Sequence, residues 1–299
     1  MTLRHRPHKV IVVPLDDRPY SVKQVRMLAE MVDYELSMPP LELLGCFTTP
    51  GQPEEIAEWL LAEAQGGADA AILSLDMLAY GGLVASRAPL VRTQLALERL
   101  GVVSTLRQRA PDMQVLASNV IMRLSITAAT DTSALYWQLL RRYSELVGLV
   151  DEFGRESHQR ELEQVRRRIP QELLGQYLAC RERNHLVNLR AIDLVAEGAL
   201  GFLALAQEDA APHGLHRSEH AALQQRMAER HVQDKVLIYP GADETGATLF
   251  ARFVQSHRHT PLHPFFTPLA GDGEALFGSS RAGGRKGESP DVNGRKGQS

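Results

Sequence analysis

The sequence has little cysteine, few aromatic residues and no long apolar run. Its two cysteines, Cys46 and Cys180, are far apart, which excludes a disulfide framework and a cysteine-rich zinc site. We therefore expect a reducing compartment and a cytoplasmic protein. No stretch approaches the ~18 apolar residues of a membrane span, and the apolar run after Lys9 is shorter than the ~7–15 residues of a signal-peptide core. A formal net charge of −3 argues against nucleic acid as the main partner.

Several cofactor and catalytic motifs are also absent. No Gly-x-Gly-x-x-Gly follows a predicted strand, which argues against a dinucleotide, and there is no Walker-type phosphate loop. The chain has no Gly-x-Ser-x-Gly elbow either, so a serine hydrolase is disfavoured. We predict no resident cofactor.

The stretch VIVVPLDDRPY, residues 10–20, shows the plan that the rest of the chain repeats. Four β-branched residues predict a buried strand, which ends at Pro14. Three charged residues follow, and helical spacing of apolar residues starts at Val22. The sequence therefore predicts a strand, a charged loop and a helix. In α/β folds the carboxyl ends of the strands are where ligands bind.

Further strands are expected at residues 34–38, 70–75, 114–122, 201–206 and 236–239, and a seventh is expected to begin at 264–266. Helical patterns lie between them, which is typical of parallel βαβ units. Because most strands end in polar residues, we expect a (β/α)8-barrel-like fold, with a doubly wound parallel sheet as the alternative. Six or seven strands do not close an eight-stranded barrel, so the barrel is expected to be incomplete.

Composition divides the chain into two expected parts. Residues 1–277 are expected to form an α/β domain of the catalytic type, in which residues 131–198 are a helical insertion. Residues 278–299 are small, charged or polar, and GRKGES recurs there as GRKGQS. Such a basic, low-complexity tail is expected to be disordered. A change this abrupt suggests a truncation or frameshift, and a genuine flexible tail is the alternative.

Four motifs give the chain a resemblance to a known family: PLDDRP at 14–19, SLDMLAYGG at 74–82, QEDAAPHG at 207–214 and PGADE at 240–244. With these motifs it resembles the bacterial family catalogued as Domain of Unknown Function 4127, over about residues 8 to 270. The resemblance implies that the polar strand ends form one site. It also implies a missing C-terminal part, because family members are longer, and it implies no particular reaction.

Asp243 and Glu244 are the predicted catalytic pair. An adjacent Asp-Glu after a strand looks like the Gly-Gly-Asp-Glu of substrate-assisted hexosaminidases, except that Ala242 replaces the second glycine. In those enzymes the Glu protonates the glycosidic oxygen and the Asp orients the 2-acetamido group of the substrate. The alternative is a helix cap, because acidic residues favour helix N-termini.

A second set of residues is predicted to bind the substrate. Its members are polar and follow predicted strands: Asp16, Asp17, Arg18, Asp76, Arg123, Gln207 and Asp209. Arginine beside aspartates can hold hydroxyls or a carboxylate. The alternatives are an ion network that braces the fold for the first three, and caps or surface charges for Asp76 and Arg123. For residues 207–209 the alternative is a solvated loop, which is favoured more for Glu208 than for Asp209.

A metal site is weighed as an alternative and is not predicted. Asp16, Asp76, Asp209 and Asp243 could meet around Mg²⁺ or Mn²⁺, which favour carboxylates. No His-x-x-x-His or paired-cysteine spacing indicates zinc. His213 and His216 are three residues apart and could ligate, although solvated loop histidines are commoner.

These residues lead to one functional hypothesis and two alternatives. The first is a hydrolase of a carbohydrate, with a small-molecule or carbohydrate substrate as its partner. The second is a sugar- or metabolite-binding protein without catalytic activity. The third is a metal-dependent lyase, isomerase or phosphoester hydrolase. The sequence contains no signal for the oligomeric state.

Overall fold

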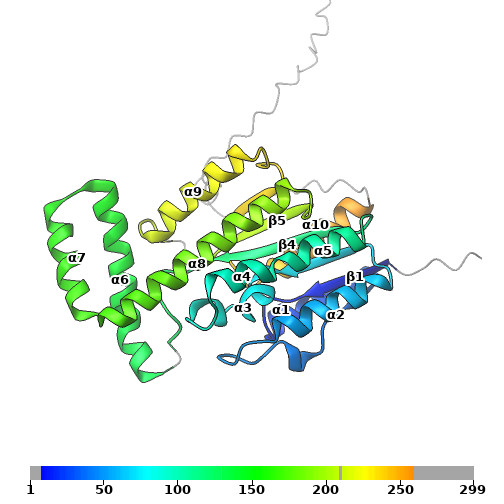
Figure 1. Cartoon of the computed structure of the whole chain (residues 1–299), viewed down its shortest axis with the longest axis horizontal. Helices are drawn as coiled ribbons and strands as arrows, with labels where there is room; N and C mark the ends of the chain where they lie inside the picture. The colour runs from blue at the N-terminus through cyan, green and yellow to red at the C-terminus, as the bar shows by residue number, and fades with distance from the viewer. Residues whose placement is uncertain (1–7, 129, 209–210, 259–299) are drawn as a thin grey trace, which may run out of the picture. The chain divides into compact units, whose positions relative to one another are not determined.

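The computed structural model describes residues 8–128, 130–208 and 211–258. Six parallel strands form one sheet in the order β2-β1-β3-β4-β5-β6 (Figure 1). The strands are β1 (His8–Val13), β2 (Tyr34–Ser37), β3 (Ala70–Ser74), β4 (Gln114–Ile121), β5 (Phe202–Gln207) and β6 (Val236–Pro240). All six strands lie where the sequence predicts them.

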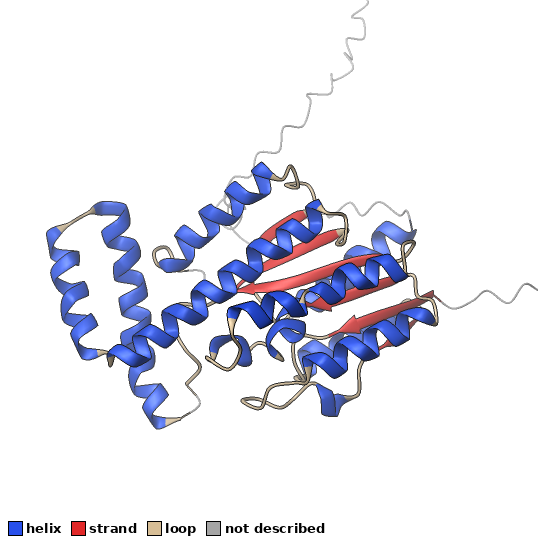
Figure 2. Ribbon diagram, viewed as in Figure 1, coloured by secondary structure: helices blue, strands red, loops and turns tan. Residues whose placement is uncertain are grey.

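Helices lie between the strands and cover both faces of the sheet (Figure 2). The helices are α1 (Pro19–Met31), α2 (Pro53–Gln65), α3 (Leu75–Tyr80), α4 (Thr93–Arg99), α5 (Gly101–Arg109), α6 (Asp131–Phe153), α7 (Glu156–Arg168), α8 (Gln171–Ala196), α9 (Leu215–Glu229) and α10 (Thr245–Arg258). Two short 3₁₀ turns, η1 (Leu41–Leu43) and η2 (Ala85–Arg87), complete the described elements.

The strand order explains which helix covers which face. The chain moves in one direction from β1 to β2, and then returns past β1 to β3 and continues to β6. Because parallel crossovers are right-handed, the reversal puts α1 on one face and the later crossover helices on the other. After β6 the chain turns back, and α10 packs beside α1. A reversal of this kind leaves a crevice at the carboxyl ends of the strands on either side of it, here β1 and β3.

Strand β1 shows why a central strand of this sheet consists of consecutive apolar residues. Val10 and Val12 pack under α1 and α10, whereas Ile11 and Val13 pack under α2. Successive side chains of a strand point to opposite faces, so a strand covered on both faces needs apolar residues throughout. Burying each of these side chains fully contributes about 1.5–3 kcal/mol before entropy is counted.

Three helices fill the range of the predicted helical insertion, and they have two different roles. α6 and α7 form an antiparallel hairpin beside the sheet (Figure 1), and they share an apolar core with the first half of α8. α8 instead packs on β4 and β5 through Val187, Ala191 and Val195, so it is the crossover helix between these strands. Only α6 and α7 are therefore additions to the β-α-β pattern.

The α/β fold is confirmed, and the described sheet has the strand order of the doubly wound alternative. β2 and β6 each have one neighbouring strand among the described residues. The barrel stays a prediction, because the seventh strand expected at 264–266 lies outside the described residues, as does the predicted tail at 278–299. Among the described helices, none is both long enough and apolar enough to cross a membrane.

Candidate functional site

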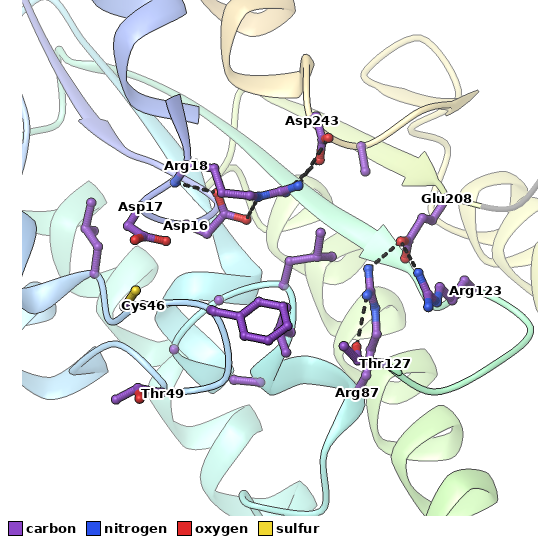
Figure 3. Close-up of a pocket in the computed structure, with 18 of the residues that line it drawn as sticks. Asp16, Asp17, Arg18, Cys46, Thr49, Arg87, Arg123, Thr127, Glu208 and Asp243 are labelled. Atoms are coloured by element: carbon purple, nitrogen blue, oxygen red, sulfur yellow. Dashed lines mark hydrogen bonds and ion pairs between the residues drawn. The ribbon is translucent and has the colours of Figure 1, made fainter. Parts of the chain in front are cut away.

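A cavity of about 650 Å³ lies at the carboxyl edge of the sheet, where the loops after β1, β3, β4, β5 and β6 meet (Figure 3). The volume is in the range of about 300–1,000 Å³ that is typical of small-molecule sites. The charged residues that line it are Asp16, Asp17, Arg18, Arg87, Arg123, Glu208, Asp243 and Glu244. Its other lining residues include Cys46, Phe47, Thr49 and Thr127.

The first group of charges, here called the Arg18 cluster, consists of Asp16, Arg18 and Asp243. The Arg18 guanidinium donates from Nε to Asp16 Oδ2 at 2.7 Å and from its two terminal nitrogens to the Asp243 carboxylate at 2.7 and 3.3 Å (Figure 3). Ser21 Oγ donates to Asp16 Oδ1 at 2.7 Å. Arg18 precedes Pro19, the first residue of α1, and its extended backbone follows from the restriction that proline imposes on its predecessor.

Partial burial alone would lower the pKa of Arg18, but the hydrogen bond to Asp243 and the charge of Asp16 raise it above its ordinary value. Arg18 and Asp243 stay 44% and 43% exposed. The Arg18 cluster therefore joins the loops after β1 and β6 while it remains accessible from the cavity.

The second group, here called the Arg87 cluster, consists of Arg87, Arg123, Glu208 and Thr127. Arg87 donates to the Glu208 carboxylate and, at 3.1 Å, to Thr127 Oγ1, and Arg123 lies 3.5 Å from the same carboxylate (Figure 3). The Arg87 side chain is only 6% exposed, and this burial lowers its pKa although Glu208 opposes the effect. Arg183 of α8 donates to the carbonyls of Ser86, Ala88 and Val91 and so holds the chain on both sides of Arg87.

Asp76 lies beneath the cavity, in the first turn of α3, and does not line it. Its Oδ2 accepts the backbone N–H of Val120 at 2.9 Å, and its Oδ1 is buried without a hydrogen-bond partner among the described residues. Burial raises the pKa of Asp76 to about 7, against the opposing effects of the Val120 hydrogen bond and the Arg87 charge. Asp76 is therefore a buried carboxyl that can change its protonation near neutral pH.

Phe47 stands at the tip of a tight turn on the wall of the cavity. Cys46 and Thr49 close the turn with two backbone hydrogen bonds of 2.9 and 3.0 Å. Phe47 itself has φ +48° and is 63% exposed. A bulky residue at positive φ costs roughly 1–2 kcal/mol, so the turn holds an exposed aromatic ring at the cavity in spite of backbone strain.

Two carboxylates of the cavity, Asp17 and Glu244, have no hydrogen-bond partner for their side chains among the described residues. Glu244 lies against the backbone of Gly241, where an added Cβ would come within 1.9 Å of Glu244 Oε1. Gly241 has φ +124°, which side-chain-bearing residues rarely adopt. The glycine before Ala242 thus gives the Glu244 carboxylate its position.

The profile of one protein family, Protein of unknown function (DUF4127), matches residues 10–274. The chain belongs to this family. The resemblance seen in the four sequence motifs is therefore confirmed.

No curated protein matches the DUF4127 chain in sequence. Two solved structures are similar to it at a low level. GanP, a glucose-galactose binding protein from Geobacillus stearothermophilus, is 12% identical, with 84% of this chain and 92% of that chain covered and a TM-score of 0.30. A 5-methylthioribose transporter solute binding protein from Thermotoga lettingae is 9% identical, with 78% and 68% covered and a TM-score of 0.26. At such TM-scores neither likeness supports a conclusion about this chain.

The structure brings most of the predicted site residues of this DUF4127 protein to the one cavity. Those that line it are Asp16, Asp17, Arg18, Arg123, Asp243 and Glu244. Asp76 lies beneath it, and the side chain of Gln207 is not part of the lining, although the Gln207 carbonyl accepts the N–H of Gly241. Asp209 lies outside the described residues. The roles of all these residues stay predictions.

Sequence reasoning missed three contributors and misjudged one. Glu208, for which a solvated loop was favoured more than for Asp209, is instead the shared partner of Arg87 and Arg123. Arg87, Thr127 and Phe47 were not singled out. A lone arginine in a loop has no periodic signal, and its partner in this case is 121 positions away.

The carboxylate metal site considered above does not form among the described residues. Asp16, Asp76 and Asp243 are not part of any group of three or more described residues whose ligand atoms all lie within 4.8 Å of one another. His213 and His216 have other contacts: His213 Nδ1 lies 2.7 Å from Glu152 Oε2, and His216 Nε2 lies 2.9 Å from the Ala211 carbonyl.

Proposed function

We propose that the cavity binds a small, neutral, hydroxyl-rich ligand of the carbohydrate class. The observation that supports this best is that two guanidinium–carboxylate clusters from five strand ends line one cavity. Each arginine among the described lining residues is already paired within the protein, so these residues offer fixed donors and acceptors and no unpaired arginine for an anion. Hydroxyl groups can bind to such groups without separating the ion pairs.

The binding free energy expected from hydroxyl contacts is consistent with the same ligand class. A hydrogen bond to a charged group contributes about 1.5–3 kcal/mol, so a few hydroxyl contacts to these clusters suffice for measurable affinity. The exposed ring of Phe47 adds an apolar face, against which the C–H face of a sugar can pack. Leu44, Leu83 and Val84 extend this apolar part of the lining.

Hydrolysis of a glycosidic bond is the second function that we propose, because the two members of the Asp243–Glu244 pair have different environments. Asp243 is held by Arg18, whereas the Glu244 carboxylate has no hydrogen-bond partner among the described residues. Paired carboxylates in different environments are a common basis of acid–base catalysis. In the proposed step Glu244 gives its proton to the departing oxygen as the bond to the anomeric carbon breaks. Water then adds to that carbon and returns a proton to Glu244.

The binding proposal is tested by titrating neutral mono- and disaccharides, including N-acetylglucosamine, into the full-length chain and measuring heat and melting temperature. We expect saturable binding by the wild type and at least tenfold weaker binding by Arg18→Ala. The matched control is Arg142→Ala, which removes an ion pair between α6 and α7 whose side chains are 42% and 41% exposed and do not line the cavity. Binding of none of these sugars, or equal loss in both variants, would overturn the proposal.

The hydrolysis proposal is tested with p-nitrophenyl glycosides and the Glu244→Gln variant. We expect release of nitrophenol by the wild type and loss of release by Glu244→Gln, while the variant still binds the sugar. Binding without release of nitrophenol in the wild type would leave only the first function. Equal release by the wild type and the variant would show that Glu244 is not the proton donor.

A further inference from the structure

A second group of ligating side chains lies at the opposite, amino-terminal edge of the sheet. His8 begins β1, Asp69 precedes β3, and His257 is in the last turn of α10. The parallel pairing of β1 with β3, in which Val10 lies beside Ala70, brings the first two together. α10 packs on the face of the sheet that Val10 and Val12 form, and this packing brings His257 close to His8 and Asp69. None of the three lines the cavity described above.

The three side chains offer two imidazole nitrogens and a carboxylate oxygen, all within 4.8 Å of one another. His8 Nδ1 lies 3.5 Å from Asp69 Oδ2. In a tetrahedral zinc site with bonds of about 2.0–2.1 Å, neighbouring ligand atoms are about 3.3 Å apart. The His8–Asp69 pair therefore has nearly the separation that a shared ion requires, and His257 needs only a small side-chain movement.

Neighbouring groups hold these side chains in place. The backbone N–H of Lys9 donates to Asp69 Oδ2 at 2.8 Å. The His8 ring stacks on Tyr34 with 5.2 Å between centroids, and the His257 ring lies edge-on to His8 at 4.6 Å and beside Phe253 at 5.2 Å. Supporting contacts of this kind orient the ligands of metal sites.

The positive charges nearby have partners of their own. Lys9 Nζ is paired with Glu63, and the Arg258 guanidinium donates to the Val32 carbonyl at 2.6 Å and faces the Tyr34 ring. Neither of these two cations is paired with Asp69, so they leave its carboxylate oxygens for another cation.

We propose that His8, Asp69 and His257 bind one divalent ion of the zinc class, with water as the fourth ligand. Two imidazoles and one carboxylate suit Zn²⁺ or Co²⁺, whereas Mg²⁺ and Ca²⁺ need mostly oxygen ligands. The ion would join the end of α10 to the starts of β1 and β3. It would stabilise the fold at the edge opposite the cavity and would take no part in ligand binding there.

The test uses the full-length chain without a tag, freed of metal with EDTA and dialysed. Zinc chloride is titrated by calorimetry, and Co²⁺ is added separately to record visible absorption. We expect one equivalent of Zn²⁺, a tetrahedral type of Co²⁺ spectrum, and a melting temperature that rises with zinc, because an ion that binds only the folded state stabilises it. Mg²⁺ is expected to have no effect.

Three variants locate the site. His8→Ala and His257→Ala are each expected to weaken zinc binding at least tenfold and to abolish the rise in melting temperature. Asp69→Asn keeps an acceptor for the Lys9 N–H, so it is expected to fold normally, as checked by circular dichroism, and to bind zinc more weakly. Sugar binding in the cavity is expected to be unchanged in all three.

Two controls keep the proposal falsifiable. His220→Ala removes a histidine on α9, and His259→Ala/His263→Ala removes two histidines outside the described residues. Both proteins are expected to bind zinc like the wild type. Binding that is lost in the His259/His263 variant but kept in His8→Ala, or zinc binding without any change in melting temperature, would overturn the proposal.

Discussion

The Arg18 cluster and the Arg87 cluster have the same chemistry and different surroundings. In both, an arginine joins loops that follow different strands of the sheet. The Arg18 side chain is 44% exposed and that of Arg87 is 6% exposed. Burial lowers the pKa of Arg87, whereas the carboxylates beside Arg18 raise its pKa despite partial burial. An exposed pair contributes little to stability and stays accessible to a ligand, whereas a buried pair cannot lose one member without a large cost. We therefore expect the Arg87 cluster to contribute more to stability and the Arg18 cluster to contribute more to binding of the proposed ligand.

The largest expected effect comes from Glu208→Ala. Arg87 would stay buried without its carboxylate, and an uncompensated buried charge costs about 3–5 kcal/mol. We expect the free energy of unfolding, measured with urea, to fall by this amount. A change below about 1 kcal/mol would show that water reaches Arg87, and the contrast between the two clusters would then disappear.

Asp76→Asn is expected to change how stability depends on pH. Because burial raises the pKa of Asp76 from 3.8 to about 7, the folded state holds this proton more tightly than the unfolded chain does. The associated stability is fully present below about pH 3.8 and is lost as the pH rises through about 7. The slope contributed by this one group is about 1.4 kcal/mol per pH unit.

The measurement compares urea unfolding of the wild type and Asp76→Asn at pH 5, 6 and 7. The asparagine keeps an acceptor for the Val120 N–H, so the variant is expected to lose the slope and to stay folded. Parallel pH profiles in the two proteins would contradict the assignment of this titration to Asp76.

The fold was more predictable than the site, because a strand can be identified from a short apolar run whereas the site depends on contacts between distant residues. Val10–Val13 and residues 70–75 are apolar runs that identify strands without knowledge of their neighbours. Asp16 and Asp243 could be expected at the same edge of the sheet, because each follows a parallel strand. The partner of Arg87 could not be predicted, because nothing near Arg87 in the sequence indicates Glu208. The strand order of the described sheet also depends on pairings between distant segments, so the choice between a barrel and a doubly wound sheet rested on the weaker ground of polar strand ends.

Phe47→Gly separates backbone strain from the aromatic ring. Glycine adopts φ +48° at no steric cost, so we expect the variant to be more stable by about 1 kcal/mol. Phe47→Ala keeps the strain and removes the ring, so it serves as the control. Both variants are expected to bind the sugar ligand more weakly than the wild type. Weaker binding in neither variant would show that the ring is not part of the site.

The smallest expected effect on stability is that of Asp243→Ala in the Arg18 cluster. The pair is about 44% exposed, and exposed pairs contribute about 0–1 kcal/mol, so unfolding by urea is expected to change by less than about 1 kcal/mol. Ligand affinity is expected to fall at least tenfold in the same variant. A stability loss as large as that of Glu208→Ala would contradict the different roles of the two clusters.

The most direct test of the account is a calorimetric titration of neutral sugars into the wild type and into Arg18→Ala, with unfolding measured on the same samples. The account predicts saturable binding by the wild type, and at least tenfold weaker binding by a variant that is almost as stable. If the wild type binds no neutral sugar, or if Arg18→Ala binds as tightly as the wild type, the proposed role of this cavity is wrong.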